Sequence, residues 1–429
     1  MLLTALGIFA VNSLVSAMEL FGGTSQGEVK LYNNFTIGNQ VAGDSQGGIN
    51  ISRIKQDGAV FTFDKSPPVR VRPDLSAEAY MIIDPHTGTD IISKNANKPL
   101  PPASLTKIMT AYVVATYISK GKLGIQDEVK VSPNALKTGK GGSRMFIEPG
   151  RLVTVDQLLL GLLAISGNDA AVALAEHVAG TETEFVKLMN DYAQDLGMVN
   201  CYFTNSHGLH DDKMLCSLND LMLLCQSIIT IYPAFYKRYF GVKRYSYAGI
   251  NQSNRNRLLF YARKEIDGIK TGHTNEAGYN LIVSGVRNGY RTIAGVMGTK
   301  NQNHRDTEVR KMMDHAYIFY RRYLHYRQGE KIADIRVRRG KQNALTVGLS
   351  ENLYSTLPYT EDDRFKVFID IFGGTIRAPI AKGQEVAELK ILFDNSDVVI
   401  TRPLVALEAV EESSPVLSIL DEILLWLGF

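Results

Sequence analysis

Apolar residues recur every three to four positions in one part of the chain and form short alternating or continuous runs elsewhere. The helical spacing predicts helices over residues 104–120, 155–178, 183–196, 217–231 and 305–324. Short apolar runs bounded by turn residues predict strands at 79–84, 90–93, 279–286 and 292–297. Because these strands come from both ends of the helical region, we expect one sheet packed against a helical cluster, which is an α+β fold.

A different pattern begins near residue 329, where the helical spacing stops. Runs rich in β-forming residues follow, separated by turn residues, at 344–347, 365–371, 386–393 and 398–403. They predict a small all-β domain over residues 329–410, after an α+β domain over 75–328. Residues 18–74 are rich in Gly, Asn, Ser and Gln and end in a proline-rich stretch, so we expect a poorly structured leader there.

The N-terminal end of the sequence is apolar. Residues 2–17 carry no charge and end in Val15-Ser16-Ala17, a small-residue pattern typical of signal-peptide cleavage, although no basic residue precedes them. The run is too short to span a bilayer. We therefore expect residues 1–17 to be a signal peptide and the protein to be exported; a buried N-terminal strand is the alternative.

Composition narrows the class of protein. The 429 residues carry a net charge of +3 without a long basic block, so nucleic acid is not an expected partner. The eight histidines form no H-E-x-x-H or similar pattern, and we expect no metal and no other cofactor. Cys201, Cys216 and Cys225 have no zinc-ribbon spacing and leave one cysteine over in any pairing, and we interpret them as buried small hydrophobic residues.

The first candidate for chemistry is Ser104 with Lys107. Two prolines just before Ser104 favour a helix start at this point. Three residues make nearly one helical turn, so the two side chains project from one face and can meet. A serine hydroxyl needs a base to become a nucleophile, and a lysine can serve when burial and positive neighbours lower its pKa. The same spacing recurs at 52–55 and 119–122, but neither lies at a comparable helix start.

The second candidate is Ser166-Gly167-Asn168, which interrupts an apolar helical stretch. A glycine between two polar residues predicts a bend that exposes both side chains. Ser166 can then relay a proton between Lys107 and a leaving amine, and Asn168 can bind the substrate backbone. A helix cap is the alternative interpretation.

The third candidate, Lys270-Thr271-Gly272, comes shortly before the expected strand at 279–286. A lysine and a hydroxyl on a strand edge can receive a substrate carboxylate, and Gly272 lets an acyl chain lie close to the backbone, as in strand addition. The same triplet at 137–139 lies in a glycine-rich stretch that we interpret as a loop.

The order Ser-x-x-Lys, Ser-x-Asn and Lys-Thr-Gly is the known arrangement of β-lactamases and penicillin-binding proteins. Specifically, the sequence resembles the serine-type D-alanyl-D-alanine carboxypeptidases of peptidase S11 type, which are low-molecular-mass penicillin-binding proteins. The resemblance runs from about residue 77 to the C-terminus, roughly four-fifths of the chain. It rests on PASLTKIMT (102–110), SGNDA (166–170), NSHGL (205–209), DGIKTGHT (267–274) and AGYNL (277–281).

This resemblance implies an antiparallel sheet with a helical cluster, then a small all-β domain and an amphipathic helix over 411–429. It implies removal of the terminal D-alanine from peptidoglycan pentapeptides through an acyl-enzyme, in cell-wall biogenesis and cell-shape control. β-Lactam antibiotics are the implied covalent inhibitors.

The resemblance also implies roles for single residues. Ser104 would be the acylated nucleophile, Lys107 its base and Ser166 the proton relay. The remaining implied cleft residues are Asn168, Lys270 and Thr271 for substrate binding, Arg305 for the terminal carboxylate, Gly272 beside the acyl chain, and the backbone N–H groups of Ser104 and His273 as the oxyanion hole.

Three further features near the implied cleft follow from the same resemblance. By this resemblance Arg255 would lie close to the cleft, the glycine-containing stretch at 139–150 would gate it, and His207 would orient groups in it. For Arg255 and Arg305 a surface salt bridge is the alternative, and for His207 a buried core position.

The tail at 415–429 resembles the family's membrane anchor, which implies attachment to the periplasmic face of the bacterial inner membrane. Apolar residues cover most of the expected helix and leave Ser418, Asp421 and Glu422 on a narrow polar face. The tail contains no Lys or Arg, so attachment to the membrane surface would rest on apolar burial alone. A helix that docks on a partner is the alternative.

Three other functions stay open. A β-lactamase shares the motifs, although no Glu-x-x-x-Asn lies between Asn168 and Lys270. A peptidoglycan DD-endopeptidase of the same superfamily usually lacks the β domain. An inactive wall-binding module has no need to retain Ser104, Lys107, Ser166, Asn168 and Lys270 together.

Overall fold

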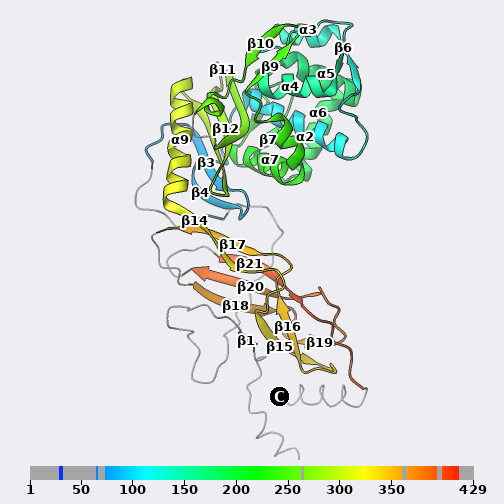
Figure 1. Ribbon diagram of the computed structural model, residues 1–429, viewed down its shortest axis with the longest axis vertical. Helices are drawn as coiled ribbons and strands as arrows, with labels where there is room; N and C mark the ends of the chain where they lie inside the picture. The colour runs from blue at the N-terminus through cyan, green and yellow to red at the C-terminus, as the bar shows by residue number, and fades with distance from the viewer. Residues whose placement is uncertain are drawn as a thin grey trace, which may run out of the picture. The chain divides into compact units, whose positions relative to one another are not determined.

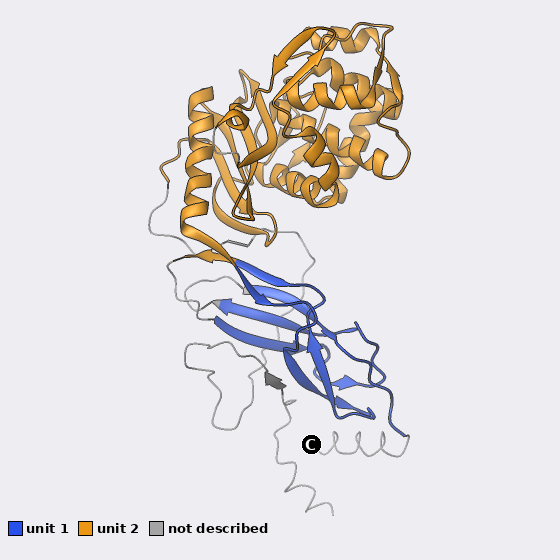
Figure 2. Ribbon diagram, in the orientation of Figure 1, with its two compact units in different colours: residues 1–57, 323–355, 361–429 blue, residues 58–322, 356–360 orange. Residues whose placement is uncertain are grey.

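The computed structural model describes residues 29–31, 64–65, 73–261, 265–359, 365–393 and 399–414. The chain forms two compact units, coloured separately in Figure 2: residues 58–322 with 356–360, and residues 1–57, 323–355 and 361–429. The expected signal peptide, most of the expected leader and residues 415–429 of the C-terminal helix expected over 411–429 lie outside the described residues; residues 411–414 are not helical, and Glu412 forms a β-bridge with Gly340. The domain boundaries expected from the sequence stay predictions.

The larger unit is built on a six-stranded sheet (Figure 1). Neighbouring strands are antiparallel except for the last pair. In spatial order the strands are β11 (Ile266–Thr274), β12 (Gly278–Arg287), β13 (Tyr290–Thr299), β3 (Ala79–Asp84), β4 (Thr89–Lys94) and β2 (Asp64–Lys65). β11 therefore stands at one edge, where an extended peptide can add as a further strand.

Both faces of this sheet are buried, because its central strands carry apolar residues at successive positions. Met81 and Ile83 of β3 pack into the core that the sheet shares with the helical cluster, whereas Ile82 packs into the core beneath α9 (Gln302–Phe319). Figure 1 shows α9 along one side of the sheet and the helical cluster on the other. Two-sided burial fixes the strand register, since a slip of one residue would move every side chain to the wrong core.

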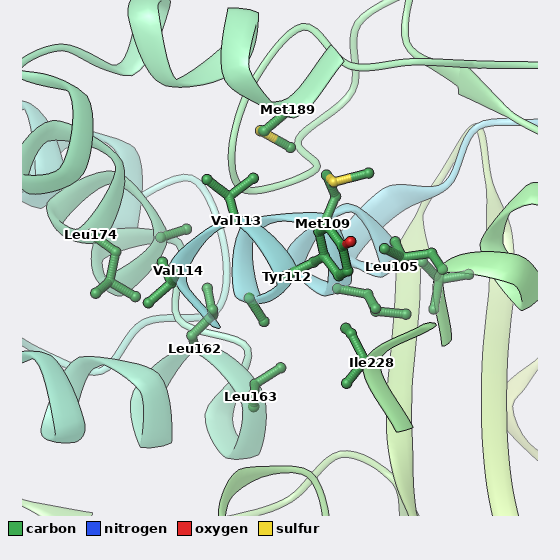
Figure 3. Close-up of a cluster of buried hydrophobic side chains, with 14 of the residues drawn as sticks. Leu105, Met109, Tyr112, Val113, Val114, Leu162, Leu163, Leu174, Met189 and Ile228 are labelled. Atoms are coloured by element: carbon green, nitrogen blue, oxygen red, sulfur yellow. The ribbon is translucent and has the colours of Figure 1, made fainter. Parts of the chain in front are cut away.

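The helical cluster surrounds α2 (Thr106–Ser119), whose residues 106–116 are all buried. A helix that is enclosed on every side is a core element and not a surface helix. Figure 3 shows Met109 and Val113 of α2 packed among apolar side chains such as Leu163 and Met189. The other helices are α3 (Pro133–Gly139), α4 (Val155–Leu160), α5 (Asn168–Ala179), α6 (Glu182–Asp195), α7 (Leu218–Ile231) and α8 (Pro233–Tyr239).

Within the described ranges, no single helix is long and apolar enough to cross a membrane; α7 and α8 meet that criterion only as a pair bent by 106°.

The described residues of the smaller unit form a β structure, which confirms the predicted all-β region. On β20 (Glu385–Phe393), Ala387, Leu389 and Ile391 are buried at alternate positions, the pattern of a strand with one apolar face. β20 lies in a seven-stranded sheet with β1 (Val29–Leu31), β15 (Ala333–Arg338), β16 (Ala344–Gly348), β18 (Phe365–Ile371), β19 (Ile376–Arg377) and β21 (Val399–Ala406).

Three expected elements differ in the structure. The helix expected over 155–178 is interrupted by a π-helical turn (Gly161–Ile165) and by Ser166, which has a left-handed φ of 67°. The helix expected over 305–324 ends at Phe319, and Tyr320–Tyr326 forms strand β14, because aromatic residues favour strands. The triplet at 137–139 is the end of α3 and not a loop, since Ser132 caps this helix and a proline occupies its first turn.

The interpretation of the cysteines is wrong for two of the three. Cys201 of β7 (Cys201–Tyr202) and Cys216 of β8 (Leu215–Cys216) form a disulfide, because these strands pair and place the two residues directly opposite each other. Cys225 is a free, buried cysteine, as expected.

Candidate active site

Ser104 lies at the start of the buried helix α2, in the short 3₁₀ turn Ala103–Leu105. Asn280 of β12 holds this turn, because its side-chain amide donates to the carbonyl oxygens of Pro101 and Pro102 over 3.1 and 3.3 Å. Gly272 of β11 also touches it: a β-carbon at this position would lie 2.8 Å from the Pro102 carbonyl oxygen. The edge strand and the helix start are thus packed directly together.

Lys107 is fully buried, one helical turn after Ser104. Its Nζ donates to Ser104 Oγ over 3.0 Å, to Asn168 Oδ1 over 2.7 Å and to the backbone carbonyl of His207. The pKa of Lys107 lies well below its ordinary value, chiefly because burial removes water from the ammonium and further because Lys270 adds a like charge. A neutral amine beside a serine hydroxyl is the form that can take its proton.

The predicted bend at Ser166-Gly167-Asn168 aims its two side chains at the two lysines. Ser166 Oγ accepts a hydrogen bond from Lys270 Nζ over 2.8 Å, and Asn168 binds Lys107. The N-cap of α5 is Gly167, which has no side-chain capping bond. Neither side chain caps α5, so the alternative interpretation of this triplet as a helix cap is wrong.

Lys270 is buried on the edge strand β11 and also donates to the Thr271 carbonyl over 3.0 Å. The pKa of Lys270 is lowered to about 7, chiefly by burial and further by the positive charges of Arg305 and Arg255. Three cationic side chains thus converge at this end of β11, which makes it a receptor for an anion.

Arg305 is buried in the first turn of α9 and pairs with Asp306: its Nε donates to Oδ1 over 2.8 Å, and its Nη2 lies 2.8 Å from the same oxygen without hydrogen-bond geometry. It is therefore not a surface salt bridge. Buried N–H groups that make no hydrogen bond are costly unless a ligand satisfies them, so Nη2 can donate to a bound carboxylate. Arg255 is exposed and makes no ion pair with another described residue.

Thr271 and His273 follow Lys270 on β11. Thr271 is buried, whereas His273 is exposed and stacks on Tyr279 with ring centroids 3.9 Å apart. The Nδ1 of His273 lies 2.8 Å from the Gly278 carbonyl oxygen, so the imidazole is held to the neighbouring strand. This contact leaves the side chain outside the buried cluster of lysines.

His207 contributes its backbone and not its side chain to the cluster. Its imidazole Nδ1 accepts from the Leu209 N–H over 3.1 Å. Burial and the charge of Lys107 lower the pKa of His207 to about 3. The imidazole is thus a neutral core group, as in the alternative interpretation, while the His207 carbonyl orients Lys107.

The sequence did not single out Asp169, which organises the stretch at 139–150. Its buried carboxylate accepts hydrogen bonds from the backbone N–H groups of Met145, Phe146, Ile147 and Ala170 over 2.8 to 3.3 Å. The Asn168 N–H adds a bond to the Ser143 carbonyl over 2.8 Å. This aspartate next to Asn168 ties the stretch to the start of α5.

Asn280 is the second residue that the sequence did not single out. A sequence signal exists, because Asn280 is a lone amide at the start of an apolar run on β12. A buried amide in such a run needs partners, which here are the prolines before Ser104 and the Gly298 N–H. Among the described residues, no group of three side chains is arranged to hold a metal ion.

Comparisons with known proteins place these residues in a family. The family model for D-alanyl-D-alanine carboxypeptidases, peptidase S11, matches residues 65–301. The chain belongs to this family. The model for the C-terminal domain of penicillin-binding protein 5 matches residues 320–412, within the β-rich part of the chain. The predicted family and enzyme class, a serine-type peptidase, are confirmed.

Curated relatives match over most of their length. D-alanyl-D-alanine carboxypeptidase DacA of Escherichia coli (strain K12) is 35% identical over 364 residues, which cover 83% of this chain and 90% of the relative. D-alanyl-D-alanine carboxypeptidase DacF of Bacillus subtilis (strain 168) is 35% identical over 344 residues, 79% and 86% of the two chains. A D-alanyl-D-alanine endopeptidase of Pseudomonas aeruginosa is 28% identical and covers only 51% of this chain.

Solved structures agree on the fold. Penicillin-binding protein 5 of Haemophilus influenzae superposes with a TM-score of 0.75 at 33% identity, covering 80% of this chain and 99% of that one. Penicillin-binding protein 6B of Escherichia coli superposes with a TM-score of 0.66 at 32% identity, covering 80% and 100%. The predicted α+β fold followed by an all-β domain is confirmed.

Proposed function

We propose that Ser104 is the nucleophile of this D-alanyl-D-alanine carboxypeptidase and that Lys107 is its base. The observation that carries the proposal is the buried Lys107 amine, held 3.0 Å from Ser104 Oγ with a lowered pKa. In its neutral form this amine accepts the hydroxyl proton. Ser104 Oγ then attacks the carbonyl carbon of the penultimate D-alanine.

The attack leaves an oxyanion on the substrate carbonyl oxygen, which the backbone N–H groups of Ser104 and His273 stabilise. Ser166 passes the proton from Lys107 to the amide nitrogen, the C–N bond breaks, and D-alanine leaves. The remaining acyl group forms an ester with Ser104. Attack by water, with Lys107 again taking the proton, hydrolyses that ester and restores the free serine.

The leaving D-alanine carries the carboxylate that the cationic end of β11 receives. Lys270, Thr271 and Arg305 bind it, and Asn168 binds the peptide backbone. The peptide lies along β11, and Gly272 keeps this strand directly against the Ser104 turn, since a β-carbon at Gly272 would lie 2.8 Å from the Pro102 carbonyl oxygen. This division of roles separates binding from proton transfer.

A fluorescent penicillin tests the nucleophile. Its strained amide reacts in the manner of the D-alanyl-D-alanine bond, so it should label the peptide that contains Ser104, located by digestion and mass spectrometry. Ser104→Ala should abolish both label and peptidase activity. Ser119→Ala is a matched control, because residues 119–122 repeat the serine–lysine spacing at the end of α2. Label on another residue of the folded protein would overturn the assignment.

The fluorescent penicillin also tests two of the other candidate functions. An inactive wall-binding module would form no adduct, and a β-lactamase would release hydrolysed penicillin rapidly. A peptide assay tests the third: faster hydrolysis of cross-linked peptides than of free pentapeptides would favour an endopeptidase. We expect a slowly released adduct and free D-alanine from a pentapeptide substrate.

We further propose that the protein is exported and attached to the membrane surface through its tail at 415–429. The apolar character of this tail supports attachment by burial in the lipid interface. Deletion of residues 415–429 should release the protein from membranes with its activity retained. If the shortened protein still sediments with membranes, the tail is not the anchor.

A further inference from the structure

The Cys201–Cys216 disulfide lies outside the residues that the proposed mechanism uses. It joins β7 to β8, with Cα atoms 4.0 Å apart. Its two cysteines are separated by 15 positions and close a loop over residues 202–215. That loop contains NSHGL (205–209), and its middle reaches the site described above.

The closed loop contacts α2 through two consecutive carbonyl groups. Lys107 Nζ donates to the carbonyl of His207, and the Thr110 hydroxyl, one turn later, donates to the carbonyl of Ser206 over 2.6 Å. Lys107 and Thr110 are both fully buried, so water cannot replace these bonds unless the core opens. The position of the loop backbone therefore determines where Lys107 Nζ lies.

Gly208 brings the same loop onto the turn that carries Ser104. It has a φ of +84°, and a β-carbon here would overlap the Ala103 carbonyl and lie 3.0 Å from the Ser104 nitrogen. The N–H of Ser104 is one of the two proposed oxyanion donors. The loop thus packs against the base and against a stabilising group of the same reaction.

Cys216 also holds the chain that leads to Ser104. Its N–H donates to the Leu100 carbonyl over 2.9 Å, and its carbonyl accepts from the Leu100 N–H over 3.0 Å. Leu100 precedes Ser104 by four residues. A single cross-link therefore acts on the loop that touches Lys107 and on the segment that enters the serine turn.

We propose that the Cys201–Cys216 disulfide is a positioning element for acylation, which holds the His207 carbonyl against Lys107 and the Gly208 backbone against the Ser104 turn. This role rests on the proposed functions of Ser104 and Lys107. Without the bond, β7 and β8 pair through only two residues each, and so short a ladder holds its register poorly. The loop then moves, and acylation slows although the fold persists.

The test compares oxidised and reduced protein in a Cys225→Ala background, which removes the remaining thiol. Tris(2-carboxyethyl)phosphine breaks the S–S bond to give two thiols and takes up oxygen from water to become the phosphine oxide. A thiol count establishes complete reduction, and circular dichroism establishes the fold. The Cys201→Ser, Cys216→Ser double variant, which cannot form the bond, is an independent second arm.

The decisive readout is the second-order rate constant for acylation by fluorescent penicillin across pH. We expect a loss of roughly tenfold on reduction, which corresponds to a barrier change of about 1.4 kcal/mol. We also expect the rise of the rate with pH to move to higher pH, because water admitted to Lys107 raises the pKa of its amine. The charged and titratable groups facing Lys107, namely Lys270 from β11, Asp169 from α5 and His207 from the loop, remain in both forms.

If the cross-link had a merely structural role, its reduction would lower the unfolding temperature but leave the acylation rate and its pH profile unchanged, and that result would overturn the positioning role. If the double variant does not fold, the reduced parent decides the question. An oxidised parent that forms no adduct would instead overturn the proposed nucleophile and base.

Discussion

Lys270 donates a hydrogen bond to Ser166 over 2.8 Å and so joins the edge strand β11 to the bend before α5. Two residues later in the same bend, Asn168 accepts from Lys107 over 2.7 Å. The bend thus holds both lysines, each through one side chain. Because the two lysines are also close enough for Lys270 to lower the pKa of Lys107, the arrangement favours a neutral base beside a cationic receptor.

The first prediction concerns pH. Since the pKa of Lys270 is about 7, the free enzyme loses this positive charge as pH rises through 7, and the receptor binds a carboxylate less well. We expect kcat/KM for a D-alanyl-D-alanine peptide to fall on this alkaline side, by at most about tenfold per pH unit. The arginine of Lys270→Arg keeps its positive charge across this pH range, so the pH profile of kcat/KM for this variant should lack the fall. Identical profiles would contradict the assignment of Lys270 as the titrating group.

A second prediction separates binding from structure at Arg305. Arg305→Gln removes the guanidinium whose Nη2 lies beside Asp306 without hydrogen-bond geometry, and we expect KM to rise by about 10- to 100-fold, the value of one charge-assisted hydrogen bond to the substrate. Arg257→Gln is the matched control, because Arg257 binds the same Asp306 over 2.7 Å but is 44% exposed. Equal changes in KM for both variants would show that loss of the Asp306 pairing, and not loss of a substrate contact, is responsible.

The sequence predicted those parts of the site that depend on local geometry. Ser104 and Lys107 meet because they are one helical turn apart, and Lys270 lies on a strand because an apolar run and a turn follow it. The order of the three motifs, compared with a known family, predicted that Ser166, Asn168 and Lys270 line one cleft, which no local rule supplies, but it did not predict the hydrogen bond between Ser166 and Lys270.

The other contacts of the site depend on packing between residues that are distant in sequence. The contact of Lys107 with the His207 carbonyl spans 100 positions, and the pairing of Cys201 with Cys216 exists only because β7 meets β8. Spacing alone does not distinguish this pair from the other two possible disulfides. Strand β14 was missed because the helical spacing of α9 continues past Phe319 into a segment whose tyrosines favour a strand.

A third prediction tests the carboxylate of Asp169. Asp169→Asn replaces a two-oxygen acceptor with an amide, so some of the four backbone N–H groups lose their partner. We expect the free energy of unfolding to fall by about 1–3 kcal/mol and the amides of residues 145–147 to exchange faster with deuterium. Asp212→Asn is the control, since the Asp212 side chain is 99% exposed and should change neither. Unchanged exchange at 145–147 in Asp169→Asn would argue against the role.

The last prediction uses two glycines with the same backbone angle. Gly208 and Gly383 both have a φ of +84°, but a β-carbon at 208 would overlap the Ala103 carbonyl, whereas one at 383 meets nothing within 4 Å. Gly383→Ala should therefore cost only the left-handed strain, about 1 kcal/mol, and leave acylation unchanged. Gly208→Ala must also displace the Ser104 turn, and we expect at least roughly a tenfold loss in the penicillin acylation rate. Equal acylation rates in the two variants would mean that the close approach of Gly208 is unimportant for the position of Ser104.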